Sequence, residues 1–122
     1  MQSKIPTTLL YKRIRFIVLC WLKHLNMELP ADLEVEIKTY SRNRWGCYKI
    51  QQHKMILYVC RTKDVGSVRP IKDILRSATH EAVHAEQIFL KSYTRSGKKV
   101  MWHGSSFQKR YKELTEELQW EI

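Results

Sequence analysis

Residues 74–89 read ILRSATHEAVHAEQIF, and this stretch decides the fold expected of the chain. Its apolar residues recur at three- and four-residue steps, which is the period of an α-helix with one buried face. The buried side is expected to consist of Ile74, Leu75, Ala78, Ala82, Ala85 and Phe89. Pro70 suits the first turn of a helix, and Gly97 interrupts the pattern. We therefore expect a helix from Ile71 to about Tyr93.

The pentapeptide HEAVH, residues 80–84, lies in the middle of this expected helix. His80 and His84 are four residues apart, so their side chains lie one above the other on one helix face and can bind one Zn²⁺ together. Glu81 can take a proton from a metal-bound water, whose pKa zinc lowers toward neutrality. Chance gives this pattern in about one such chain in a hundred. Its place in an amphipathic helix favours a zinc site over two surface histidines.

A catalytic zinc ion has three protein ligands and one position for water. The third ligand that we favour is His103, which follows a basic segment and precedes the last expected helix. Gly104 beside it permits a sharp turn of the main chain. Acidic residues of the last helix are the alternative third ligands: Glu113, Glu116 and Glu117.

The rest of the chain predicts one α+β domain over residues 1–122. Residues 7–26 carry an apolar stripe at helical spacing, formed by Leu10, Ile14, Ile17, Val18, Trp21 and Leu25. The last helix is expected to begin near Ser105 with a capping box. Residues 33–40 alternate between apolar and polar, as a half-buried strand does. Residues 44–50 and 54–60 predict two more strands, which gives the order α-β-β-β-α-α.

Gly46 stands inside the second predicted strand. A glycine in a strand marks a bulge or a place where another part of the protein comes close to the main chain. Gly46 is therefore expected to lie at a bulge or at such a close approach.

The charge of the chain points to an anionic partner. The 122 residues carry 22 basic and 12 acidic side chains, a net charge of +10, which favours nucleic acid or another polyanion.

Three cysteines form no CxxC pair and fit a reducing compartment. The apolar run 16–22 is too short to span a bilayer and lacks a cleavage site. We expect an intracellular monomer, cytoplasmic or in the nucleoid or nucleus, without a membrane partner.

Two segments, 38–63 and 87–112, carry basic side chains and no acidic ones, and aromatic residues are interleaved in the first. Cations neutralise phosphates, and aromatic faces stack on unpaired bases. The candidate nucleic-acid contacts are Lys38, Arg42, Arg44, Trp45, Lys49, Lys54, Lys98 and Lys99. The simpler interpretation is a solvated outer face of a sheet.

Taken together, these motifs resemble the SprT-like, Spartan-related zinc metalloproteases. The resemblance spans roughly residues 7–120 and is carried by RWGC at 44–47, HEAVH followed by Ala85, and HGSSF at 103–107. It implies a small zincin-like metalloprotease domain with an N-terminal helix, a three-stranded antiparallel or mixed sheet, the HExxH helix and a C-terminal helix. It also implies that His80, His84 and His103 bind zinc and that Glu81 is the catalytic base.

The resemblance extends to a role in DNA repair, because members of this family degrade proteins that are crosslinked to DNA. Many members carry a C-terminal Cys-rich zinc ribbon or a DNA-binding tail. This chain stops at Ile122 without either, which implies a minimal stand-alone protease.

The sequence thus predicts an endopeptidase with one Zn²⁺ per chain that cleaves proteins bound or crosslinked to DNA. Single-stranded DNA or a DNA junction is the expected nucleic-acid partner. Two alternatives stay open. One is a non-catalytic, zinc-stabilised nucleic-acid-binding module, and the other is a zinc amidohydrolase that acts on a small substrate.

Overall fold

The computed structural model describes residues 7–89 and 105–119. Helix α1 (Thr7–Leu25) comes first, and the strands are β1 (Glu34–Lys38), β2 (Gly46–Lys49) and β3 (Lys54–Tyr58). Helices α2 (Ile71–Phe89) and α3 (Ser105–Thr115) follow, and short 3₁₀ turns lie at η1 (Ile50–Gln52) and η2 (Glu116–Gln119). The α+β class and the predicted order of helices and strands are confirmed.

The three strands form a mixed sheet in the order β1-β3-β2. β3 lies in the centre, parallel to β1 and antiparallel to β2. Ile56 of β3 stands between Glu36 of β1 and Cys47 of β2. The chain therefore passes from β1 to the far edge of the sheet and returns between the two strands already formed.

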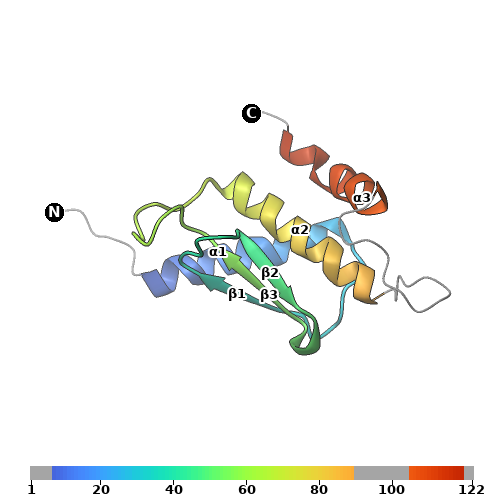
Figure 1. The fold of residues 1–122 in the computed structure, drawn as a ribbon, viewed down its shortest axis with the longest axis horizontal. Coiled ribbons are helices and arrows are strands. Elements are labelled where there is room, and N and C mark those ends of the chain that lie inside the picture. The colour runs from blue at the N-terminus through green and yellow to red at the C-terminus, as the bar shows by residue number, and fades with distance from the viewer. Residues whose placement is uncertain (1–6, 90–104, 120–122) are drawn as a thin grey trace.

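Helices α1 and α2 pack against each other and against one face of the sheet (Figure 1). Val35, Met55 and Leu57 point to the helices because side chains alternate along a strand. They share a buried core with residues of both helices: Ile14, Val18, Leu22, Ile74, Leu75, Ala78 and Ala82. Helix α3 packs on α2, and Figure 1 shows it on the side away from the sheet.

The burial of α2 agrees with its predicted periodicity. Ile74, Leu75, Ala78, Ala82 and Ala85 are all buried. The side chain of Phe89 lies outside the described residues, as does the predicted extension of the helix to Tyr93. The three alanines let the neighbouring elements approach α2 closely, which brings the sheet near the HEAVH segment.

The predicted apolar stripe of α1 is wrong in one place. Ile17 is 41% exposed, whereas Leu22 is buried with Ile14 and Val18. These three buried residues follow a strict four-residue step, so the line of contact on α1 is narrower than the pattern suggested.

A hydrogen bond ties α1 to α2 one residue before His80. The indole Nε1 of Trp21 donates to Oγ1 of Thr79 over 2.9 Å, and that hydroxyl donates to the carbonyl of Leu75 over 2.7 Å.

Among the described helices, none has the length and hydropathy that crossing a bilayer requires.

Candidate metal centre

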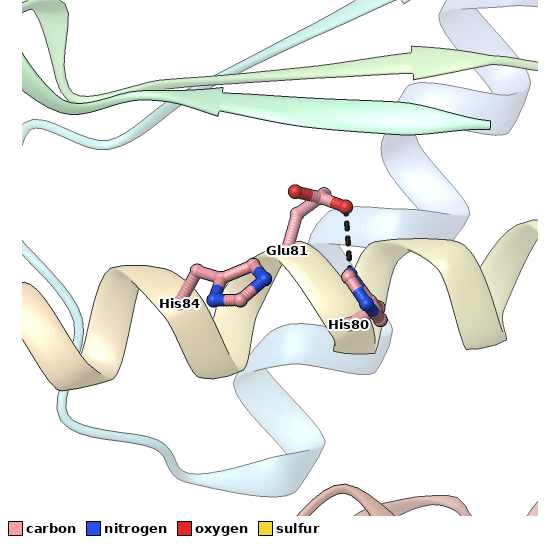
Figure 2. A group of neighbouring side chains, drawn as sticks. All are labelled: His80, Glu81 and His84. Atoms are coloured by element: carbon pink, nitrogen blue, oxygen red, sulfur yellow. Dashed lines mark hydrogen bonds and ion pairs between the residues drawn. The ribbon is translucent and has the colours of Figure 1, made fainter. Parts of the chain in front are cut away.

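His80, Glu81 and His84 form a group that could hold a metal ion. One potential ligand atom from each side chain lies within 4.8 Å of the other two. All three residues are on α2, and Figure 2 shows Glu81 pointing toward the sheet with both imidazoles beside it. Helical spacing alone brings His80 and His84 together, as the sequence predicted: their ring centroids are 4.9 Å apart.

The Nδ1 atoms of both imidazoles contact side-chain oxygens. Nδ1 of His84 lies 3.2 Å from Oε1 of Gln87, and Nδ1 of His80 lies 2.9 Å from Oε2 of Glu81. Because amide and carboxylate oxygens accept, these contacts suit the neutral tautomer with the proton on Nδ1, in which Nε2 is the ring atom with a lone pair. This is the arrangement in which protein imidazoles bind metal ions, so the residues present fit such an ion.

Phe107 of α3 packs beside both imidazoles. It is 1% exposed, its ring stacks on His84 at 4.7 Å between centroids, and the His80 ring is 5.0 Å away. An apolar wall of this kind fixes the orientation of the rings and shields the site from water. In the sequence, the signal for this role is the Phe that ends HGSSF.

An ion pair between Glu86 and Arg110 joins α2 to α3. Buried Glu86 accepts from Nε and an Nη of Arg110 at 2.9 and 3.1 Å, and from the main-chain nitrogen of Glu28 at 3.0 Å. The fork holds α3 in place one helical turn from Phe107. No motif indicated this pair, although an acidic residue among buried alanines is a signal that it needs a partner.

Gly46 lies directly against Glu81. A β-carbon at Gly46 would be 3.2 Å from Cγ of Glu81 and 3.0 Å from the carbonyl oxygen of Ile56. In the register of the sheet Gly46 stands opposite Leu57, on the face that covers α2. The expected close approach at this glycine is confirmed, and the neighbour is the Glu81 side chain.

His80 and Glu81 line a cleft of about 570 Å³. Its other described walls are Trp45, Gly46, Arg61, Arg69, Asp73, Arg76, Ser77 and Tyr111. Such a volume falls in the usual range of ligand sites. Burial raises the pKa of the Tyr111 phenol, with Arg76 opposing and Asp73 adding to that effect, so Tyr111 presents a protonated hydroxyl at neutral pH. A ligand in the cleft can therefore reach His80 and Glu81.

The favoured third ligand, His103, lies outside the described residues. The acidic alternatives do not join the group: Glu113, Glu116 and Glu117 are exposed, and none is among the described residues that cluster with the two histidines. Glu117 instead pairs with His24 at 3.0 Å. The described part of the chain thus supplies two imidazoles and one carboxylate.

Three of the candidate nucleic-acid contacts that the structure describes already have partners. Glu36 of β1 pairs with Lys38 of the same strand at 3.9 Å and with Lys54 of the neighbouring strand β3 at 3.4 Å. The guanidinium of Arg69 covers the Trp45 ring at 4.0 Å from its centroid. Arg42, Arg44 and Lys49 are exposed. Lys98 and Lys99 lie outside the described residues.

Comparisons with known proteins leave the chain without an assigned family. No family model, no curated protein and no solved structure matches it.

Proposed function

We propose that the protein is a zinc-dependent endopeptidase of the zincin type, similar to the SprT-like proteases. His80, His84 and His103 would bind one zinc ion, and Glu81 would be the general base. The observation that carries this proposal is the group of His80, Glu81 and His84, of which His80 and Glu81 line a cleft large enough for a substrate. Neutral imidazoles are preferred zinc ligands, which favours zinc over calcium or magnesium.

When bound, zinc would activate water and polarise the carbonyl group of the substrate. Glu81 would accept the proton of the attacking water and deliver it to the leaving amine. Its side chain is suited to this because it is confined between Gly46 and His80, which limits the positions of the carboxylate. A base that is already oriented loses little entropy in the reaction.

The edge of the sheet beside the cleft favours a polypeptide substrate. β2 is an edge strand of the described sheet, and its first residue, Gly46, lines the cleft with Glu81. An extended peptide can add to such an edge through main-chain hydrogen bonds. A small amide would gain nothing from this edge, so the amidohydrolase alternative has less support.

The substrates that we propose are proteins bound or crosslinked to DNA inside the cell. Support comes from the net charge of +10 and from exposed Arg42, Arg44 and Lys49 around β2. The pairing of Lys38 and Lys54 with Glu36 weakens this support, since those two charges are partly neutralised. DNA would then hold the enzyme close to its substrate.

One contact favours a second function, a non-catalytic zinc-stabilised module that binds nucleic acid. Oε2 of Glu81 is 2.9 Å from Nδ1 of His80. A carboxylate in this position can orient a metal-binding imidazole without taking part in proton transfer. In that case Glu81 would act in zinc binding and not in proton transfer.

The Glu81→Gln variant separates the two functions. The protease proposal expects one zinc per chain in the variant and no cleavage of DNA-binding proteins, with or without single-stranded DNA. The module proposal expects weaker zinc binding and no cleavage by the parent protein either. Glu34→Gln makes the same chemical change at an exposed position and is the matched control. A Glu81→Gln variant that cleaves as fast as its parent would exclude Glu81 as the base.

A further inference from the structure

Three arginines line the same cleft as His80 and Glu81. They are Arg61, Arg69 and Arg76. Among the described residues that line the cleft, Asp73 is the one carboxylate besides Glu81. Three guanidinium groups and Asp73 therefore share the wall with Glu81, and the balance of their charges decides what the cleft attracts.

Arg69 is a buried cation that is hydrogen-bonded to no carboxylate of the described residues. It is 8% exposed, and its Nη atoms donate to the carbonyls of Tyr58 and Asp73 at 3.1 Å each and to Oγ of Ser77 at 2.9 Å. Burial lowers the pKa of this guanidinium, Asp73 raises it, and Arg61 lowers it. Arginine stays protonated in proteins, so its charge persists inside the wall.

The carboxylate of Asp73 is already engaged. Nη1 of Arg76 donates to its Oδ1 over 2.9 Å, and Nη2 of Arg76 donates to the carbonyl of Leu118 over 3.1 Å. The charge of Asp73 thus offsets that of Arg76. The charges of Arg61 and Arg69 remain without a carboxylate that is hydrogen-bonded to either of them in the described part of the chain.

Arg61 is the accessible one of these cations. Its side chain is exposed, and within the described residues it forms no ion pair. Its main chain is held firmly: its nitrogen donates to the carbonyl of Ser67 over 3.0 Å, next to the bridge between Cys60 and Val68. The main chain of Arg61 is thus anchored beside the cleft, and its exposed guanidinium is available to an incoming anion.

We propose that this cleft selects polypeptides that place an acidic side chain against Arg61, beside the bond presented to Glu81. The inference rests on the proposed function, because it takes the cleft to be the substrate site. A guanidinium binds a carboxylate through a charge-assisted, two-point hydrogen bond, which gives both affinity and orientation.

A polypeptide carboxylate suits the cleft better than nucleic-acid phosphates do. A nucleic-acid strand carries a negative charge on every residue, so it would bring phosphates close to Glu81 and Asp73 as well as to Arg61. A peptide can place a single carboxylate at Arg61 and a neutral main chain at Glu81. The mixture of charges along the wall therefore matches an isolated acid.

The test measures binding in the zinc-loaded Glu81→Gln variant, so that no probe is consumed. The probes are fluorescent peptides of otherwise uncharged residues that carry one Glu, one Gln or one Lys at each position in turn. At the best position we expect the Glu peptide to bind about tenfold more tightly than the Gln peptide. Adding Arg61→Gln should remove the difference, and Arg61→Glu should reverse it in favour of Lys. Arg13→Gln, on the exposed side of α1, is the matched control.

Four results would overturn the inference. Two of them concern the peptides alone: all peptides bind equally, or the Glu peptides do not bind measurably. In the third, the preference for Glu survives Arg61→Gln. In the fourth, Arg61→Gln weakens the binding of a single-stranded oligonucleotide and leaves the binding of every peptide unchanged. Thermal unfolding of each variant shows that it is folded. Failure of the protease proposal would look different: the parent protein would leave every peptide intact while Glu81→Gln still discriminates Glu from Gln.

Discussion

Gly46 and Glu81 meet so closely that a β-carbon on the glycine would be 3.2 Å from Cγ of the glutamate. The same β-carbon would be 3.0 Å from the carbonyl oxygen of Ile56. The first contact can be relieved by a side-chain movement, whereas the second involves main chain in the centre of the sheet. Position 46 thus couples the edge of the sheet to the candidate base.

Gly46→Ala is expected to lower the free energy of unfolding by about 1–3 kcal/mol, because the added methyl group overpacks this contact. It should also slow cleavage, because Glu81 must move. Urea unfolding in the presence of a chelator measures the first effect without a contribution from metal. Gly66→Ala is the control, since its β-carbon would meet only the exposed Asp64 carboxylate at 3.4 Å. Equal stability of the two variants would contradict the close packing.

Glu86→Ala is expected to lower the free energy of unfolding by about 2–3 kcal/mol. It removes a buried acceptor of three hydrogen bonds and leaves the main-chain nitrogen of Glu28 without its partner. The ion pair with Arg110 contributes little to this loss of stability, because the Arg110 side chain is 37% exposed and water screens its charge. Zinc affinity should fall as well, since α3 carries Phe107. Glu117→Ala, in an exposed pair with His24, should change neither quantity.

The helices were predictable from sequence because each carries a strong local signal. The four-residue spacing of His80 and His84 fixes their proximity on α2 whatever surrounds it, so the core of the candidate site was predicted as well. The glycine at position 46 predicted a close contact, but the sequence did not indicate that the neighbour would be Glu81. That contact depends on how β2 lies over α2, and no local pattern encodes it.

Runs of basic residues along the chain predicted the nucleic-acid contacts less well than the helical pattern predicted the candidate metal site. The segment 38–63 lacks acidic residues, yet parallel pairing places Glu36 of β1 beside Lys54 of β3. Because the two strands are distant in sequence, the neutralising partner could not be read from the basic segment itself. The cover of Arg69 over Trp45 has the same origin. Contacts between distant segments thus decide which of these side chains already have a partner.

His103→Ala tests the third ligand, which lies outside the described residues. We expect one zinc per chain in the parent protein and a loss of zinc affinity of at least about tenfold in His80→Ala, His84→Ala and His103→Ala, because a catalytic site needs three protein ligands. Competition with a chromophoric chelator gives the affinity. His24→Ala, at an exposed histidine, is the control. Full zinc affinity in His103→Ala would mean that another residue completes the site.

Tyr111→Phe tests whether the phenol in the cleft donates a hydrogen bond to the reacting carbonyl. The change keeps the ring that stacks with Phe107 at 6.1 Å between centroids, so zinc binding and folding should be preserved. If the hydroxyl stabilises developing negative charge, kcat should fall about 10²-fold while KM changes little. Tyr40→Phe, outside the described cleft walls, is the control.

The pH profile gives a second measurement on Tyr111. Burial raises the pKa of its hydroxyl above the ordinary tyrosine value, so the protonated donor persists through neutral pH and is lost only at more alkaline pH. Cleavage by the parent protein should therefore decline at alkaline pH through a step that Tyr111→Phe lacks. An unchanged kcat in Tyr111→Phe, with the alkaline step retained, would assign the stabilisation of the carbonyl to a different donor.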